Sequence, residues 1–379
     1  MSLPDGAVIL QVLPALRSGG VEQGTVEMVR AITAQGGRAL VASAGGPLVA
    51  SVEAAGGRHV TLPLATKNPL RIWRNAAALA RLVRDEGVTL VHARSRAPAW
   101  SALLAARRTG ARFLTTYHAP YSAGLPGKRL YNSVMARGER VIAISQFVAG
   151  LVQAQHGVRS GRIRLIPRGV DPERFDPAAV SADRVAALRT QWGLRADRPV
   201  VLLPGRLSRW KGHDKLIEAL RWSRTPGLVA VFAGPLDRRD RYVATLRRLA
   251  EASDVAERVR FVGQCDDMPA AMLLADVVVS PSVAPEGFGR VVIEAQAMRR
   301  PVIATEHGGG AETVSHGQTG WLVPPSDPVA LASAIDRVLA LPAAERDRVA
   351  AAARRSVLAR YTTAAMQRAT IAVYAELLE

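Results

Sequence analysis

The sequence contains little that could bind a metal ion or cross a membrane. Its single cysteine, Cys265, cannot form an internal disulfide, and its seven histidines form neither an HExxH motif nor a His-x-His pair. We therefore predict no metal site and expect a reducing compartment, the cytoplasm. The sequence contains no run of about 18 uncharged apolar residues, so we predict no membrane-spanning helix. The first residues lack the basic segment and the small-residue cleavage site of a signal peptide.

Acidic residues are scarce in the first half of the chain, and aromatic residues are scarce throughout. Residues 1–168 contain 22 Lys and Arg but 7 Asp and Glu, whereas residues 169–379 contain 28 and 25. The positive field of the first half predicts an anionic partner, such as a phosphorylated lipid or a membrane surface. A basic surface that keeps the chain soluble is the alternative. The aromatic content of 5% and the lack of zinc-finger and RNP motifs argue against nucleic acid.

Short apolar runs alternate with helix-like stretches, which is typical of parallel sheets covered on both faces. We expect strands at 7–13, 38–44, 58–64, 88–93, 112–118, 140–145 and 162–167, and again at 199–205, 227–234, 258–263, 276–282, 301–306 and 320–324. The predicted fold is α/β, with two Rossmann-like doubly wound domains and an interdomain cleft, because 379 residues suffice for two domains. We place the domains at 1–168 and 199–362, with a linker at 169–198. The last helix, 363–379, is expected to pack back on the first domain.

The segment APEGFGRVVIEAQAMRRPVIAT, residues 284–305, carries the strongest chemical signal. Glu286 and Glu294 are eight residues apart, and the surrounding proline and glycines keep Glu286 in the loop before a helix. Free N–H groups at a helix start bind anions, and a carboxylate farther along can accept hydrogen bonds from a ribose. Glycosidase carboxyl pairs lie roughly 5–9.5 Å apart, whereas eight helical residues rise about 12 Å. The spacing therefore disfavours a hydrolase.

This segment resembles the C-domain signature of the retaining GT-B glycosyltransferases of family 4, the glycosyl transferases group 1. Further resemblance lies in PGRLSRWKG (204–212), RGVDPERF (168–175) and HGGGAETVSHGQTGWLVPPSDP (307–328), in the family's order. The resemblance implies a nucleotide-sugar donor linked to UDP, GDP or ADP, and no other cofactor. Two fixed cations can stabilise a diphosphate leaving group without a metal.

The resemblance also assigns roles to individual residues. It implies diphosphate contacts for Gly19, Gly20, Arg206, Lys211, Gly287, Phe288 and Gly289. Glu294 would bind the ribose. The catalytic residues would be Glu286, at hydroxyls of the transferred sugar, and His118, near the anomeric carbon. Many members of the family have Asp where Ala119 follows His118. We interpret Ser145 as a helix N-cap first and a ligand contact second.

The first domain is expected to bind the acceptor. Basic residues lie among apolar ones in two segments, at Arg71, Arg74, Arg81 and Arg84 and at Lys128, Arg129, Arg137 and Arg140. Such segments can lie on an anionic membrane. We hypothesise a lipid-linked or phosphorylated glycan acceptor, as in lipopolysaccharide biosynthesis, with peripheral contact at the inner face of the cytoplasmic membrane. An ordinary amphipathic helix is the alternative for these segments. For the whole chain the alternatives are a GT-B-fold nucleotide-sugar epimerase and a non-enzymatic basic binding module.

Overall fold

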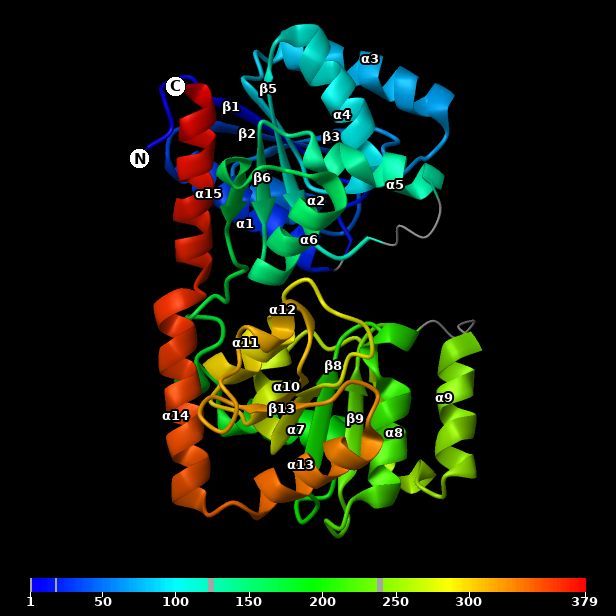
Figure 1. Ribbon diagram of the computed structural model, residues 1–379. Helices are drawn as coiled ribbons and strands as arrows, with labels where there is room; N and C mark the ends of the chain where they lie inside the picture. Colours follow the sequence, from blue (N-terminus) through cyan, green and yellow to red (C-terminus); the bar gives the residue numbers. More distant parts are fainter. Residues whose placement is uncertain (1, 18, 122–125, 237–240) are drawn as a thin grey trace. The chain divides into compact units, whose positions relative to one another are not determined.

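Two units of the chain each fold around their own parallel sheet. The computed structural model describes residues 2–17, 19–121, 126–236 and 241–379 (Figure 1). Unit 1 comprises Met1–Pro167 and Thr363–Glu379, and unit 2 comprises Arg168–Thr362. The predicted fold class, two Rossmann-like doubly wound α/β domains, is confirmed. No helix among the described residues is long and apolar enough to span a bilayer.

Unit 1 contains a seven-stranded sheet in the order β3-β2-β1-β4-β5-β6-β7. Its strands are β1 (Val8–Val12), β2 (Arg38–Ser43), β3 (Arg58–Thr61), β4 (Leu90–Ala93), β5 (Arg112–Tyr117), β6 (Arg140–Ala143) and β7 (Ile163–Leu165). Its helices are α1 (Gly20–Ala34), α2 (Val49–Ala54), α3 (Pro69–Asp85), α4 (Arg96–Thr109), α5 (Pro126–Ser133), α6 (Gln146–His156) and α15 (Thr363–Leu378). All its neighbouring strands are parallel.

The strands of unit 1 form where apolar residues follow one another without alternation. Every residue of β1 is buried, including Gln11, because both faces of the sheet are covered. The predicted strand 58–64 ends at Thr61, two residues before Pro63, which has no N–H to donate. Ser145 is the N-cap of α6, and its Oγ accepts a hydrogen bond of 3.0 Å from the N–H of Val148.

The C-terminal helix α15 belongs to the core of unit 1. Met366, Ile371 and Tyr374 are buried in the same apolar cluster as strand residues from β1, β2 and β4. The hydroxyl of Tyr374 lies 2.8 Å from Nδ1 of His92 in β4, whose Nε2 lies 2.7 Å from the hydroxyl of Thr116 in β5. A residue from the chain end is thereby connected to two central strands.

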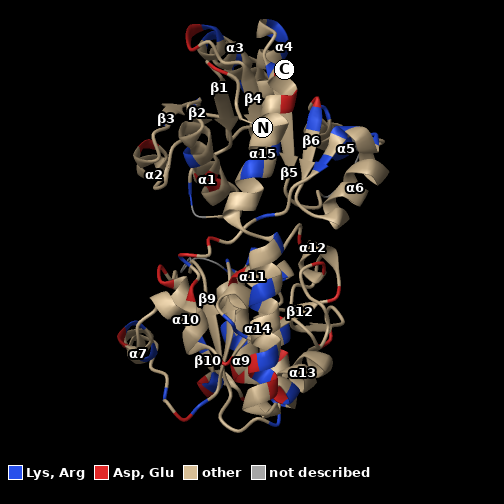
Figure 2. Cartoon of the chain, turned by 90° about the vertical axis from the view of Figure 1, so that its left-hand side faces the viewer, with Lys and Arg blue, Asp and Glu red and all other residues tan. Residues whose placement is uncertain are grey.

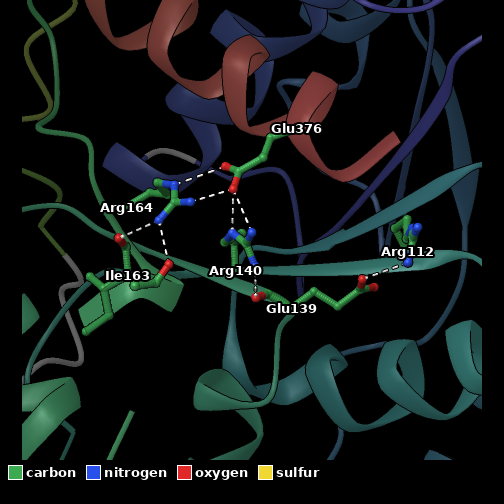
Figure 3. A network of polar contacts seen from close by, with 7 residues as sticks. Arg112, Glu139, Arg140, Ile163, Arg164 and Glu376 are labelled. Carbon is green, nitrogen blue, oxygen red and sulfur yellow. Dashed lines mark hydrogen bonds and ion pairs between the residues drawn. The ribbon is translucent and has the colours of Figure 1, made fainter. Parts of the chain in front are cut away.

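Ion pairs also hold α15 against the amino ends of the last strands of unit 1. Glu376 accepts hydrogen bonds from Arg140, at the start of β6, and from Arg164 in β7 (Figure 3). The two guanidinium groups lower the pKa of Glu376, Arg164 through its hydrogen bond most strongly. The carboxylate therefore stays ionised at neutral pH and joins three elements of unit 1.

Unit 2 contains a six-stranded parallel sheet in the order β10-β9-β8-β11-β12-β13. Its strands are β8 (Val200–Pro204), β9 (Val229–Ala233), β10 (Val259–Gly263), β11 (Val277–Ser280), β12 (Val302–Thr305) and β13 (Trp321–Val323). Its helices are α7 (Ala182–Gln191), α8 (His213–Trp222), α9 (Arg241–Ala252), α10 (Met268–Leu274), α11 (Arg290–Ala297), α12 (Gly308–Ala311), α13 (Pro328–Ala340) and α14 (Ala343–Arg360).

Residues 169–198, expected as a linker, carry α7 and lie in unit 2. Arg184 of α7 donates to both carboxylate oxygens of Asp267, at 2.8 and 2.7 Å. Arg354 of α14 lies 3.2 Å from Asp176. Residues 169–198 are therefore fixed to the rest of unit 2 by these two ion pairs.

Candidate functional site

The order of the strands in unit 2 marks one place where a ligand is expected. The first strand, β8, lies between β9 and β11, so the chain leaves it once toward β9 and later returns on its other side as β11. The loops after two such strands diverge, and open parallel sheets bind their ligands in the resulting crevice at the carboxyl ends. The loop after β8 carries Arg206 and Lys211, and the loop after β11 carries Glu286.

Lys211 and Glu286 form an ion pair at this place. Nζ of Lys211 lies 2.8 Å from Oε1 of Glu286, and the two side chains are only 14% and 13% exposed. The hydroxyls of Ser280 and Ser282 donate to the same carboxylate oxygen, that of Ser280 at 3.3 Å. Burial by itself would raise the pKa of Glu286, but the charge of Lys211 and these hydrogen bonds outweigh it and lower the pKa. Glu286 is therefore a largely buried carboxylate that stays ionised.

The loop that carries Lys211 requires a glycine. Gly212 has φ of 73°, and a Cβ at this position would overlap the carbonyl oxygen of Pro281 in the loop after β11. The N–H of Val283 donates to the carbonyl oxygen of Trp210 at 2.9 Å, so the two loops are also joined through the backbone. Nζ of Lys211 lies 4.4 Å from the centre of the Trp210 ring. These contacts set the position of the ammonium group.

A glycine-rich stretch supports the loop that carries Glu286. Gly308, at the start of α12, has φ of 68°, and a Cβ there would lie 2.7 Å from the carbonyl oxygen and 2.8 Å from the nitrogen of Glu286. The N–H of Gly309 donates to that carbonyl oxygen at 2.8 Å. Nε2 of His307 lies 2.8 Å from the carbonyl oxygen of Ser282. The glycine-rich motif at 307–328 therefore packs directly against the loop that begins the Glu-x7-Glu motif.

The other predicted donor contacts lie in the same part of unit 2. Gly289 is the N-cap of α11, which begins at Arg290, so Glu286 and Gly287 lie in the loop before the helix, as expected. Glu294 lies on α11, 3.4 Å from Nε of Arg290. The side chain of Phe288 is buried and packs edge-on against Tyr361. Only the backbone of Phe288 is therefore available to a ligand, whereas Arg206 is exposed.

Three predicted residues lie in unit 1. Gly19 is the N-cap of α1 and Gly20 is its first residue, after β1, whereas His118 follows β5 directly and is half-buried. All three come after the carboxyl ends of strands, where ligands bind in parallel sheets. Their roles at a donor or an acceptor stay predictions.

Two residues that support the site, His213 and Gln296, were not predicted from the sequence. His213 follows Gly212, is fully buried and packs edge-on against Phe232, with ring centres 5.1 Å apart. Burial, followed by the charge of Lys211, lowers the pKa of His213 to about 4, so the ring is neutral at pH 7. Gln296 of α11 donates to the carbonyl oxygens of Thr313 and Thr319, each at 3.0 Å. The one signal in the sequence that could have indicated these supporting residues is the histidine next to the Lys-Gly pair.

Within the described ranges, no group of three or more His, Cys, Asp or Glu side chains is placed to hold a metal ion. The cationic groups at the predicted diphosphate site are Lys211 and Arg206. Together with a buried carboxylate and glycine-lined loops, they suit a ligand that has both a diphosphate and several hydroxyl groups.

Comparisons with known proteins agree with this geometry. Residues 185–356 match the model of the family described as Glycosyl transferases group 1, and residues 18–174 match that of Glycosyltransferase Family 4. The GDP-mannose-dependent alpha-(1-6)-phosphatidylinositol monomannoside mannosyltransferase of Mycolicibacterium smegmatis is 33% identical over 285 residues, which cover 70% of this chain and 71% of that enzyme. The chain belongs to the family 4 glycosyltransferases, enzymes of GT-B fold.

Solved structures extend the likeness to nearly the whole chain. A glycosyltransferase from Rickettsia africae is 34% identical with a TM-score of 0.91, and the match covers 99% of this chain and 100% of that one. HepE from Anabaena, solved in complex with UDP and glucose, is 25% identical with a TM-score of 0.87, and the match covers 98% and 100% of the two chains. The family membership favours a transferase over the epimerase and the binding module.

Replacing Lys211 by Met should destabilise the protein by more than the energy of the lost ion pair. The reason is that Glu286 would remain largely buried without its counter-charge. We expect a loss of about 3–5 kcal/mol in the free energy of unfolding, measured by urea denaturation at pH 7. The double variant Lys211→Met/Glu286→Gln should recover a large part of that loss. Because the pKa of Glu286 is lowered, the contribution of the pair is present above the ordinary value of 4.5 and disappears as the pH falls through the lowered pKa. Equal stability of the single and double variants would contradict this account.

Replacing Gly308 by Ala tests the support of the Glu286 loop, and Gly317 provides a matched control. Both glycines have left-handed backbone, with φ of 68° and 74°, but a Cβ on Gly317 would meet nothing within 4 Å. Each variant should lose about 1–2 kcal/mol from backbone strain. Only Gly308→Ala should also displace Glu286 and weaken the binding of a nucleotide sugar, measured by calorimetry. Equal binding by the two variants would show that the loop tolerates the displacement.

Proposed function

We propose that unit 2 binds a nucleotide diphosphate sugar and that the enzyme transfers its hexose, with retention of anomeric configuration, to an acceptor bound by unit 1. The observation that carries the proposal is the buried Lys211–Glu286 ion pair beside Ser280 and Ser282. A buried ion pair adds little net stability, and ionisable groups in such surroundings cluster at functional sites, so the pair favours a ligand-binding role.

The pair suggests how the donor is held. The ammonium of Lys211 has three N–H donors, and its hydrogen bond to Glu286 leaves others for a phosphate oxygen. Oε1 of Glu286 accepts from Lys211, Ser280 and Ser282, which leaves Oε2 for a hydroxyl of the sugar. Within the described residues Arg206 has no ion-pair partner and can contact the diphosphate. Gly19 and Gly20 of unit 1 are proposed as further diphosphate contacts.

As the bond to the anomeric carbon breaks, negative charge grows on the leaving diphosphate. Two cations whose positions do not change stabilise that charge without a cost of reorganisation. In this proposal Gly287, Gly289 and the backbone of Phe288 present the start of α11 to the phosphates. Glu294 accepts from the ribose, and His118 of unit 1 lies near the anomeric carbon. No step requires a metal ion.

The proposed acceptor is a lipid-linked or phosphorylated glycan of the cell envelope, as in lipopolysaccharide-type biosynthesis. Unit 1 carries most of the excess positive charge, because residues 1–167 and 363–379 contain 22 basic and 9 acidic residues, whereas the rest of the chain contains 28 and 23. The names of two relatives support the chemistry: a mannosyltransferase acting on a phosphatidylinositol monomannoside, and a D-inositol 3-phosphate glycosyltransferase of Catenulispora acidiphila. Both names describe acceptors that contain a phosphate.

A peripheral membrane contact through α3 and α5 belongs to the same proposal. Leu70 and Trp73 of α3 are 73% and 60% exposed, and Leu130 of α5 is 63% exposed. Basic residues, blue in Figure 2, lie on the same helices: Arg71, Arg74, Arg81 and Arg84 on α3, and Lys128 and Arg129 on α5. Exposed apolar side chains next to cations are typical of helices that lie on anionic bilayers, here the inner face of the cytoplasmic membrane.

Replacing Arg206 by Ala should reduce turnover by about 10²–10³-fold, because one of two cations at the leaving group is lost. Its side chain is exposed, so the fold should be unaffected. The donor is first identified by thermal shift with UDP-, GDP- and ADP-linked hexoses, and release of the nucleoside diphosphate is then measured. Arg221→Ala, which removes an exposed arginine from α8, is the control. Failure of every nucleotide sugar to stabilise the wild-type protein would refute the proposed donor site.

The double variant Leu70→Gln/Trp73→Gln should bind anionic liposomes more weakly than the wild-type protein in a sedimentation assay at low salt. Each side chain contributes about 1.5–3 kcal/mol when it is fully buried in an apolar phase, so a loss of at least tenfold is expected. Trp222→Gln is the matched control, because Trp222 is 59% exposed but lies in unit 2. Equal sedimentation of all three proteins would exclude α3 from the membrane contact.

A further inference from the structure

The sheet of unit 1 also has a point at which the loops after two neighbouring strands diverge, here called its divergence point. In the order β3-β2-β1-β4-β5-β6-β7, the chain leaves β1 toward β2 and returns on the other side as β4. A ligand is therefore expected at the carboxyl ends of β1 and β4. The loop after β1 leads to Gly19 and Gly20, for which the resemblance to the family implied diphosphate contacts. After β4 come Arg94 and Ser95 in the loop and Arg96 at the start of α4, for which no motif predicted a role.

Arg96 is held at this point by an amide and an aromatic ring. It is the first residue of α4 and half-buried, and its Nη1 donates to Oδ1 of the buried Asn132 at 2.8 Å. The central carbon of its guanidinium group lies over Tyr121, 4.0 Å from the ring centre. Among the described residues, no carboxylate lies within ion-pair distance of Arg96. The fixed group therefore retains N–H donors that no acidic side chain occupies.

The groups around Arg96 are neutral phenols. Burial raises the pKa of Tyr121 to about 12, although the charge of Arg96 opposes the shift, and burial also raises the pKa of Tyr117 and Tyr131. All three tyrosines feel the charge of Arg96. The rings of Tyr117 and Tyr121 lie 4.4 Å apart, and Tyr121 is three residues from His118. A fixed cation beside neutral hydroxyls, with no carboxylate of the described residues within ion-pair distance, favours an anion over a cation or an uncharged sugar.

We infer that Arg96 recognises a phosphate group of the acceptor and that the tyrosines around it contact the rest of the acceptor next to His118. This inference rests on the proposed function and gives its acceptor a recognition residue. A planar guanidinium, preoriented by Asn132 and Tyr121, can donate two parallel hydrogen bonds to a phosphate. The phosphate is either a monoester on a free polyol or the diester of a lipid headgroup, and both present the same pair of oxygens.

The test measures binding of three soluble probes by calorimetry, with the donor site filled by the nucleoside diphosphate that stabilises unit 2. The probes are D-myo-inositol 1-phosphate, glycerophosphoinositol and myo-inositol. The wild-type protein should bind both phosphate esters more tightly than myo-inositol. Arg96→Gln should weaken the esters by about tenfold or more and leave myo-inositol unchanged. Arg96→Lys should retain part of the affinity, and the relative affinity of the two esters distinguishes a free phosphate from a headgroup.

The matched control is Arg107→Gln, which removes one exposed positive charge from the last turn of the same helix. It should bind all three probes as the wild-type protein does. The inference is overturned if Arg96→Gln binds the esters as tightly as Arg107→Gln, or if the wild-type protein does not prefer them to myo-inositol. Nucleoside diphosphate binding and slow hydrolysis of the donor are measured in every variant. Their absence from the wild-type protein would instead refute the proposed function, so the two failures are distinguishable.

Discussion

The buried ion pair between Lys211 and Glu286 is the interaction around which unit 2 is arranged. Two charges removed from water require close contact and further hydrogen bonds to be tolerated, and Ser280 and Ser282 supply them. The contact is possible only because two backbone segments approach it closely, at Gly212 and at Gly308. Gly212 and Gly308 are thus explained by one requirement, which is to bring a cation and a carboxylate together at the ends of β8 and β11.

The same topological position is used differently in the two units. In unit 2 the loop after β8 carries Lys211, which is paired with a carboxylate, and the exposed Arg206, and the proposed donor offers a phosphate to the cations and a hydroxyl to Glu286. In unit 1 the cation is Arg96, which lies over an aromatic ring and has an amide as its hydrogen-bond partner. A carboxylate beside two cations suits a donor that has sugar hydroxyls as well as a diphosphate, whereas Arg96 among neutral phenols suits a phosphate group. One fold, used twice, therefore provides two sites with different polar groups.

The strands and the glycine motifs could be predicted because each depends on local properties of the sequence. Apolar runs such as VILQV predicted β1, and the prolines at 63 and 281 explain why two strands are shorter than expected. The contact between Lys211 and Glu286 could not be predicted in the same way, since 75 residues separate them and only the sheet order makes their loops neighbours. Arg96 was missed for a related reason. It stands in no recognised motif, and its significance follows from the position of β4 beside β1.

The C-terminal helix imposes a constraint that no local pattern reveals. The core of unit 1 includes Tyr374 and Glu376, yet unit 2 lies between them and the rest of unit 1 in the sequence. Unit 1 is therefore incomplete until the last residues of the chain are in place, whereas unit 2 is continuous. The two segments that connect the units are joined where Val170 donates to the carbonyl oxygen of Tyr361 at 2.9 Å. Since His92 of β4 contacts Tyr374 and lies four residues before Arg96, the loop inferred to hold the acceptor begins on a strand that the chain end stabilises. Completion of unit 1 thus requires that the chain has first passed through the whole of unit 2.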